Sequence, residues 1–232
     1  MKLVKPSTEI ITPINGKEVL QTLELVARNC YKSENKITES SAEDMVAMLI
    51  RNGHEAMIEF FDITVRFVCD RGVSHEIVRH RLASYAQEST RYCNYSLSKF
   101  DNNVTYVIPS WFNLEEGVWD ANRIAELAGK RSAENEQELL GPITWVISMY
   151  DAEKAYNKLI EHGWKAQQAR SVLPNSLKTE IIVKMNLREW RHFFKMRTST
   201  AAHPQMRELT IPLLKEFQQL IPIVFDDLTQ EK

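Results

Sequence analysis

Glycine is scarce in this sequence, with seven residues in 232. No G-x-G-x-x-G pattern follows a candidate strand. No G-x-x-x-x-G-K-[ST] pattern occurs either, because Gly16-Lys17 and Gly129-Lys130 both lack the rest of that motif. Rossmann domains and P-loop proteins use these glycine-rich patterns to bring the backbone close to phosphate groups. The chain therefore has neither of these nucleotide-binding loops.

Cysteine is equally sparse. Cys30, Cys69 and Cys93 are widely spaced, and no C-x-x-C pair occurs. This predicts neither a disulfide framework nor a thiolate metal site, and we expect all three to be reduced. His75 and His80 are five residues apart, whereas the zinc-protease motif needs histidines four apart on one helical face, so we expect no bound metal. The absence of a G-x-S-x-G motif disfavours a serine hydrolase.

The chain also lacks a long apolar run and an excess of positive charge. No stretch approaches the roughly 20 apolar residues of a membrane-spanning helix. Residues 1–6 lack the apolar segment of a secretory signal, so we expect a soluble, cytoplasmic protein without a membrane partner. The net charge of −2 argues against a general nucleic-acid-binding protein, whose affinity comes from neutralising phosphates. We therefore expect no nucleic-acid partner.

Apolar periodicity predicts an α+β fold in a single domain spanning residues 1–232, with helices packed around a modest mixed or antiparallel sheet. Helical spacing predicts helices at residues 17–31, 41–52, 135–161 and 165–172, one starting after Asn186, and a last one after Ala202-His203-Pro204. Alternation of apolar and polar residues predicts strands at residues 61–69, 104–108 and 179–185. Strands and helices are interspersed without a regular βαβ rhythm, which favours α+β over α/β.

The segment after the first predicted strand contains turn and loop signals. Asp70-Arg71-Gly72 is expected to form a turn, and Ser74 is expected to cap the short helix that follows. Residues 84–96 are polar and aromatic, and contain neither glycine nor proline. We expect them to form a long ordered loop, the kind of segment that often carries functional residues.

Oxyanion donors are concentrated within fourteen residues of this segment. They are Arg79, His80, Arg81, Ser84, Gln87, Glu88, Ser89, Thr90, Arg91 and Tyr92. Guanidinium groups bind phosphates in a bidentate manner, and hydroxyls and loop amides can complete the binding shell. This composition predicts a site for a phosphorylated metabolite. In an equally weighted alternative, Arg79 and Arg81 are solvated or paired with surface carboxylates.

A second polar group occurs on the helix predicted after the last strand. It comprises Asn186, Arg188, His192 and Arg197. Arg188 and His192 are one turn apart and share a face, opposite much of the apolar stripe of Leu187, Trp190 and Phe194. Because every amphipathic helix has a polar face, this group gains weight only through its pairing with the first cluster.

The stretch RHRLASYAQESTRY resembles the signature of the flavin-dependent thymidylate synthases, which is an RHR triplet, seven residues, a serine and, two residues later, an arginine. Here these are Arg79-His80-Arg81, Ser89 and Arg91. The resemblance extends over most of the chain. It includes Gly53-His54-Glu55 with Glu59, the stretch ARSVLP at residues 169–174, Asn186 with Arg188, and Arg197 ahead of His203.

The resemblance implies an enzyme that converts dUMP to dTMP by reductive methylation. It implies FAD as the cofactor, with NADPH and methylenetetrahydrofolate as co-substrates that supply reducing equivalents and the one-carbon unit. It also implies a homotetramer in which the flavin lies across subunits. A family that makes little use of a glycine loop for its nucleotide cofactor agrees with the missing Rossmann pattern.

The resemblance also implies roles for individual residues. The implied flavin contacts are His54, Glu59, Arg79, His80, Arg81, Gln87, Asn186, Arg188 and His192. The implied substrate contacts are Glu76, Arg79, Gln87, Glu88, Ser89, Thr90, Arg91, Arg170 and Arg197. Arg197 is the implied catalytic residue, because a guanidinium beside the pyrimidine can stabilise the ring as its N3 anion. No protein nucleophile is then needed, and Cys93 is interpreted as a bystander.

The sequence departs from the family pattern at a few positions. Ala86 and Gln87 stand where Asn and Glu are common, Ala56 stands at a commonly hydroxylated position, and His192 replaces an expected Asn. Two alternatives therefore stay open. One is a non-catalytic nucleotide- or RNA-binding module that uses the loop from Arg79 to Arg91. The other is a family member that retains flavin but has lost synthase activity.

Overall fold

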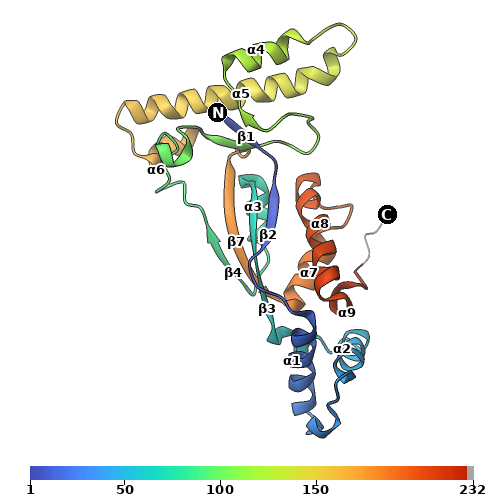
Figure 1. Cartoon of the computed structure of the whole chain (residues 1–232). Helices are drawn as coiled ribbons and strands as arrows, with labels where there is room; N and C mark the ends of the chain where they lie inside the picture. The colour runs from blue at the N-terminus through green and yellow to red at the C-terminus, as the bar shows by residue number, and fades with distance from the viewer. Residues whose placement is uncertain (229–232) are drawn as a thin grey trace. The chain divides into compact units, whose positions relative to one another are not determined.

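The computed structural model describes residues 1–228, which form two compact units. Unit 1 comprises Met1–Pro6, Val68–His75 and Gln87–Glu180, and unit 2 comprises Ser7–Phe67, Glu76–Ala86 and the chain from Ile181 onward. Strands β3, β4 and β7 and helix α3 each contribute residues to both units. Figure 1 labels the helices and strands of both units.

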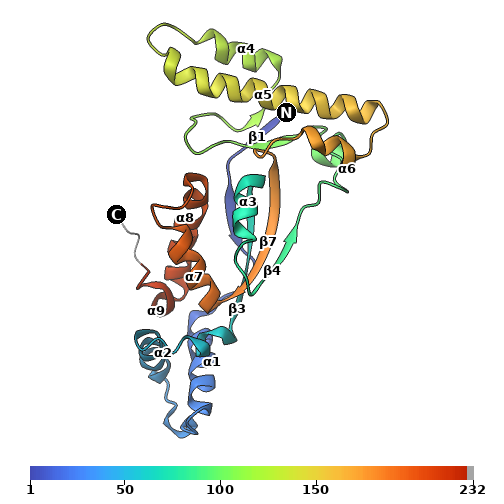
Figure 2. The same cartoon turned by 180° about the vertical axis from the view of Figure 1, so that it is seen from behind.

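Unit 1 contains a three-stranded sheet and a group of helices that includes the longest helix of residues 1–228. Strand β1 (Lys2–Val4) lies in the centre, parallel to β5 (Thr105–Val107) and antiparallel to β6 (Gly117–Val118). The helices of this unit are α4 (Ala121–Gly129), α5 (Glu136–Glu161) and α6 (Ala166–Ala169), with the short 3₁₀ helices η3 (Ser98–Phe100) and η4 (Arg170–Val172). Helices α4 and α5 run side by side (Figures 1 and 2).

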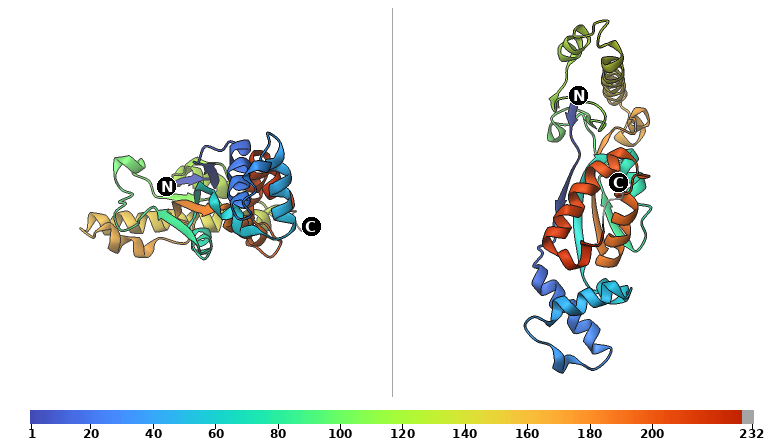
Figure 3. Two further views of the ribbon diagram at one scale, coloured as in Figure 1. Left: turned by 90° about the horizontal axis from the view of Figure 1, so that it is seen from below. Right: turned by 90° about the vertical axis from the view of Figure 1, so that its right-hand side faces the viewer.

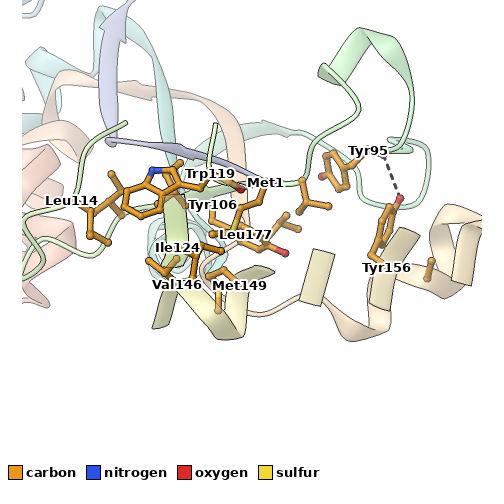
Figure 4. Close-up of a cluster of buried hydrophobic side chains, with 14 residues drawn as sticks. Met1, Tyr95, Tyr106, Leu114, Trp119, Ile124, Val146, Met149, Tyr156 and Leu177 are labelled. Atoms are coloured by element: carbon orange, nitrogen blue, oxygen red, sulfur yellow. Dashed lines mark hydrogen bonds between the residues drawn. The ribbon is translucent and has the colours of Figure 1, made fainter. Parts of the chain in front are cut away.

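The core of unit 1 lies between this sheet and α5. Trp119, Tyr106 and Met149 are among its buried side chains (Figure 4). The backbone N–H of Tyr95 donates to the hydroxyl of Tyr156 at 3.3 Å, so a buried polar group is satisfied inside the apolar cluster. The segment that follows Gln87 is thereby tied to α5.

Unit 2 holds most of a four-stranded sheet with the order β2-β3-β7-β4. Its strands are β2 (Ser7–Ile10), β3 (Asp62–Asp70), β4 (Ala83–Gln87) and β7 (Lys178–Asn186). Its helices are α1 (Gly16–Asn29), α2 (Ser41–Arg51), α7 (Leu187–Arg197), α8 (Pro204–Leu220) and α9 (Pro222–Phe225), with η1 (Glu34–Lys36) and η2 (Glu55–Phe60). Helix α3 (Arg71–Ile77) leads from unit 1 into unit 2. Helices α7 and α8 lie side by side next to the strands (Figure 3).

Aromatic packing fixes the orientation of α7. Trp190 is fully buried, stacks on Phe67 of β3 and contacts Phe193, Phe194 and Phe217. Its indole N–H donates to the carbonyl of Ile63 at 3.0 Å. Burying a cluster of this kind stabilises a fold by several kcal/mol, and Trp→Ala changes in cores typically cost about 3–5 kcal/mol. The polar face of α7 is thereby turned away from the sheet.

The α+β class predicted from the sequence is confirmed. All predicted helices and strands form, with ends that differ by at most three residues. Residues 63, 65, 67 and 69 of β3 are buried as the alternation indicates, and Gly53 ends α2 with a positive φ of 69°. The single domain expected over residues 1–232 stays a prediction. The described chain divides into two compact units, and these units share strands.

Three local predictions are wrong, namely the turn at residues 70–72, Ser74 as a helix cap, and residues 84–96 as a loop. Asp70-Arg71-Gly72 is not a turn, because α3 begins at Arg71, and the Asp70 carboxylate caps it by accepting from the Val73 N–H at 2.7 Å. Ser74 is inside this helix and buried. Residues 84–96 are not entirely loop, because residues 83–87 form β4 at the end of the four-stranded sheet. None of the helices within residues 1–228 combines the length and apolar character needed to cross a membrane.

Candidate functional site

A cavity of about 590 Å³ on unit 2 collects one set of the predicted residues. We call it the arginine pocket. It is lined by Glu76, Arg79, His80, Arg81, Glu189, His192, Met196 and Arg197. These residues come from the end of α3, the turn that follows it, and the polar face of α7. The two polar groups singled out in the sequence therefore meet within one unit.

The turn at the end of α3 places the side chains of the RHR triplet in different environments. The backbone N–H groups of Arg79 and His80 donate to the carbonyls of Glu76 and Ile77, which continues a helical turn. This turn directs His80 inward, where its ring packs against the edge of Phe193, with 4.8 Å between ring centroids. His80 is 4% exposed, whereas Arg79 and Arg81 are both exposed. The Tyr85 hydroxyl donates to the His80 carbonyl and holds the turn in place.

Arg197 is held by three hydrogen bonds at the edge of the pocket. One terminal nitrogen donates to the Glu76 carboxylate at 2.8 Å, and the other donates to the Glu76 carbonyl at 3.1 Å. Its Nε donates to Nε2 of His80 at 2.9 Å. The guanidinium is largely buried and its plane is fixed before any ligand binds. Such preorganised charge is the kind that stabilises a developing anion most effectively.

Arg79 and Arg81 are both exposed at the arginine pocket, in contrast to the largely buried Arg197. Among residues 1–228 neither side chain forms an ion pair or a hydrogen bond. Arg79 and Arg81 are therefore not paired with surface carboxylates within residues 1–228, and the alternative in which they are solvated stays open. They leave two uncompensated guanidinium groups at the mouth of a pocket, which favours an anionic ligand.

Burial and charge set the protonation state of the inner groups. Burial, with smaller effects from Arg197 and His192, lowers the pKa of His80 to about 4. His80 is therefore neutral at neutral pH and able to accept from Arg197. Burial also raises the pKa of Glu189, against the opposing effects of His192 and Arg188.

A neighbouring cavity of about 380 Å³, which we call the Arg188 pocket, collects more of the predicted flavin contacts. Glu59, Asn186, Arg188 and His192 line it, together with Glu55, Leu82, Glu189, Arg191 and Lys195. Arg188 donates to Glu59 at 2.6 Å and lies 3.5 Å from Glu55. The side-chain oxygen of Asn186 caps α7 by accepting from the Glu189 N–H at 2.9 Å. His192 and Glu189 belong to both cavities.

His54 lies apart from these two cavities. It is exposed and lines a mostly apolar cavity of about 440 Å³ on unit 2, with Cys30, Met45 and Met57. The structure of unit 2 thus brings together every predicted residue of this unit except His54.

The remaining predicted residues lie on unit 1, and Gln87 and Glu88 are tied down there by internal hydrogen bonds. Gln87 donates to the Ser74 hydroxyl at 2.9 Å. The Glu88 carboxylate accepts from the Tyr95 hydroxyl at 3.0 Å and from Lys178 at 3.2 Å. These bonds fix the chain at the start of the stretch from Ser89 to Arg91.

Ser89, Thr90, Arg91 and Arg170 follow on the same unit. Arg170 donates to the Thr90 hydroxyl at 2.9 Å, which joins two stretches that are eighty residues apart in the sequence. The Ser89 hydroxyl accepts from the Arg91 N–H at 3.4 Å, and the Arg91 guanidinium lies over the Tyr92 ring, 5.4 Å from its centroid. Arg91 is exposed and forms no ion pair within residues 1–228.

Six residues that line these pockets are not among the predicted site residues: Glu55, Leu82, Glu189, Arg191, Lys195 and Met196. Glu189 lines both pockets, Glu55 contacts Arg188 and Arg191, and Leu82 is 84% exposed with a positive φ of 67°. Glu189 precedes His192 by one helical turn, so its spacing could have placed it on the polar face of α7. No sequence signal identifies the backbone of Leu82, because leucine rarely adopts this conformation.

The thiols of Cys69 and Cys93 are poorly suited to nucleophilic attack. Burial is the main cause that raises the pKa of Cys69, and also that of Cys93, where the Glu88 charge adds to the effect. A thiol is a much weaker nucleophile than a thiolate. The interpretation of Cys93 as a bystander agrees with this.

His80, Glu189 and His192 form a cluster that was not predicted from the sequence. Their candidate ligand atoms all lie within 4.8 Å of one another, a spacing that could hold a metal ion. This cluster does not use the His75 and His80 pair that was considered from the sequence.

Comparison with known proteins relates the chain to one family. The sequence model described as thymidylate synthase complementing protein matches residues 14–223. A flavin-dependent thymidylate synthase of Pyrococcus furiosus is 31% identical over 214 residues, covering 89% of this chain and 78% of the relative. One of Geobacter sulfurreducens is 30% identical over 210 residues, covering 88% of this chain and 79% of the relative.

A solved structure shares the fold of the chain. The UMP/dUMP methylase PolB from Streptomyces cacaoi, bound with 5-Br dUMP, superimposes with a TM-score of 0.73 at 18% identity. The match covers 97% of this chain and 96% of that one.

Proposed function

Because the chain belongs to the flavin-dependent thymidylate synthase family, we propose that it catalyses the reductive methylation of dUMP to dTMP. The proposed cofactor is FAD, with methylenetetrahydrofolate as the one-carbon donor and NADPH as the reductant. The observation that carries the proposal is the fixed Arg197 guanidinium in a pocket whose mouth holds the unpaired Arg79 and Arg81.

The donor set of the two pockets suits a flavin nucleotide. The pyrophosphate of FAD carries negative charge, and Arg79 and Arg81 supply guanidinium groups that no carboxylate within residues 1–228 neutralises. Arg188, Asn186 and His192 supply further polar contacts from the polar face of α7. When bound, the flavin supplies a hydride, and the protein residues bind and orient the reactants.

Arg197 is the proposed catalytic residue. Methylation at carbon 5 of uracil needs electron density at that carbon, and a guanidinium beside the pyrimidine stabilises the ring as its N3 anion. The three hydrogen bonds of Arg197 hold the charge in one orientation, which reduces the reorganisation that the reaction would otherwise require. Protonated thiols at Cys69 and Cys93 agree with a reaction that uses no protein nucleophile.

The residues of unit 1 are proposed to bind the nucleotide. Arg91 presents an exposed guanidinium with no carboxylate partner among the described residues, which suits a phosphate. Ser89 and Thr90 add hydroxyls, and Arg170 is held at Thr90. We propose that Gln87 and Glu88 contribute at the start of this stretch, and that Glu76 and Arg79 are further dUMP contacts, as the resemblance implies.

We propose, in line with the resemblance, that the active assembly is a homotetramer with sites shared between subunits. Light scattering coupled to gel filtration measures the mass directly. A particle of four chains supports this part of the proposal, and a monomer that forms thymidylate contradicts it.

The test of the proposed function is a turnover assay with the purified protein. With dUMP, NADPH, methylenetetrahydrofolate and FAD present, the protein is expected to form dTMP, and omission of dUMP, NADPH or methylenetetrahydrofolate should abolish the product. A protein that binds flavin but forms no dTMP matches the alternative of lost synthase activity. A colourless protein that binds RNA in a salt-sensitive manner matches the binding-module alternative.

A further inference from the structure

The inner wall of the arginine pocket contains two buried polar atoms that face each other without a hydrogen bond. They are Nδ1 of His80 and Oε1 of Glu189, which lie 3.5 Å apart. The His80 ring is 4% exposed, and the Glu189 side chain is 14% exposed. Buried polar atoms without partners are costly, so a pair of them at this distance suggests a designed interaction.

The contact with Arg197 determines which nitrogen of His80 carries the proton. An arginine Nε–H is always a donor, so Nε2 of His80 must be the acceptor in the 2.9 Å hydrogen bond. A neutral imidazole has one protonated nitrogen, and the proton therefore lies on Nδ1, directed toward Glu189.

The hydrogen bond from Arg197 also decides whether the cluster of His80, Glu189 and His192 holds a proton or a metal ion. A metal bound by His80, Glu189 and His192 would need the lone pair of Nδ1, because Nε2 already accepts from Arg197. A neutral imidazole cannot offer lone pairs on both nitrogens. As long as Arg197 donates to His80, the cluster holds a proton.

Glu189 is held in place for this interaction by the start of α7. It is the third residue of the helix, and its backbone N–H donates to the Asn186 side chain at 2.9 Å. A carboxylate near a helix N-terminus is stabilised by the helix dipole. Arg188 and His192 on the same helix, and Tyr85 beside the His80 carbonyl, are the other titratable groups that influence Glu189.

We infer that Glu189 is a positioning residue that keeps the proton of His80 on Nδ1, which leaves Nε2 free to accept from Arg197. His80 and Glu76 together then fix the guanidinium that acts on the pyrimidine. The catalytic consequence of this inference rests on the proposed function, but the arrangement of Glu189, His80 and Arg197 does not.

The test compares Glu189→Leu with Glu189→Gln and with the control Glu216→Leu, which changes an exposed glutamate on α8. Leucine removes the acceptor, so we expect kcat for dTMP formation to fall roughly 10- to 100-fold because Arg197 is less well oriented. The KM for dUMP should stay unchanged. Glutamine keeps an acceptor oxygen and should recover most of the rate. The control should behave like the unaltered protein.

Nitrogen-15 NMR of histidine-labelled protein provides a readout that does not depend on turnover. The unaltered protein should show His80 protonated at Nδ1 only, Glu189→Leu should lose this single tautomer, and Glu189→Gln should restore it. Zinc chloride should leave the His80 signals unchanged. The inference is overturned if Glu189→Leu keeps the tautomer, if it loses the tautomer with no change in kcat, or if Zn²⁺ shifts the His80 signals. If no dTMP forms at all, the proposed function fails while the tautomer measurement still decides the arrangement.

Discussion

The segment Arg79 to Arg81 and the segment Gln87 to Glu88 lie close together in the sequence, but their polar side chains are satisfied in different ways. Arg79 and Arg81 project outward with no partner among residues 1–228. Gln87 and Glu88 are each held by hydrogen bonds to their own unit, through Ser74 for Gln87 and through Tyr95 and Lys178 for Glu88.

This difference separates ligand binding from preorganisation. A free guanidinium costs the apoprotein little and becomes useful when an anion arrives. A side chain that is already hydrogen bonded fixes the backbone around it, which reduces the entropy lost on binding. One stretch of sequence that reads as a uniform cluster of polar residues thus supplies both kinds of group.

Arg197 combines both properties and should give the largest effect. Arg197→Ala removes a fixed guanidinium, so kcat for dTMP formation is expected to fall roughly 100- to 1,000-fold, while the protein stays folded and flavin-bound. Steady-state kinetics and the flavin absorbance measure the two properties. Lys215→Ala on α8 is the control, because Lys215 is exposed and does not line this pocket. Turnover that is unchanged in Arg197→Ala would refute its catalytic role.

Removing an unpaired arginine should affect binding but not stability. Arg79→Ala and Arg81→Ala are each expected to weaken FAD binding by about 10- to 100-fold, the value of a charge-assisted hydrogen bond. The stability of the flavin-free protein should change by less than about 0.5 kcal/mol. Titration calorimetry and urea unfolding measure these quantities, and Arg51→Ala, at an exposed position of α2, is the control. Full FAD affinity in both variants would show that neither guanidinium group contributes to FAD binding, and it would contradict this prediction.

The opposite result is expected for Glu88. Glu88→Leu leaves the Tyr95 hydroxyl without its acceptor and removes one partner of Lys178, so the free energy of unfolding should fall by about 1–3 kcal/mol. Urea unfolding of the flavin-free protein tests this, with Glu126→Leu on the exposed face of α4 as the control. If Glu88→Leu and its control have the same stability, the contrast between the two segments disappears.

A smaller effect concerns acid stability. The unfolded state protonates its histidine near the ordinary pKa of 6.5, whereas folded His80 stays neutral down to about pH 4. The unfolded state therefore takes up more protons as the pH falls, and His80 lowers the stability by about 1 kcal/mol between about pH 7.5 and 5.5. His80→Gln should lose this part of the pH dependence, and His75→Gln, at an exposed position, should keep it. Urea unfolding at both pH values makes the comparison, and identical pH slopes in all three proteins would contradict it.

The sequence predicts those helices and strands that bury one face, because burial of one face produces a periodic pattern of apolar residues. The alternation from Ile63 to Cys69 and the apolar stripe of Leu187, Trp190 and Phe194 both reflect burial of one face, and both elements form as expected. Short strands are different, because their partners lie far away in the sequence. Residues 2–4 of β1 pair with residues 105–107, and the five residues of β4 are partly exposed and show no apolar face.

The site is predictable by residue type but not by pairing. The RHR stretch and the polar face of α7 identify the residues of the arginine pocket, but the contacts of Arg197 with His80 and Glu76 join positions more than one hundred residues apart. Glu189 was overlooked because acidic residues are common at helix starts for electrostatic reasons alone. Its significance depends on the buried nitrogen of His80, which only the tertiary structure places beside it.

The most direct test of the account is the visible spectrum of the purified protein before and after addition of dUMP. We predict flavin absorbance that survives gel filtration, shifts when dUMP is added, and is lost on incubation with NADPH as the flavin becomes reduced. A colourless protein that neither retains added FAD nor forms dTMP would contradict the assignment of Arg79, Arg81 and Arg197 to a flavin and pyrimidine site.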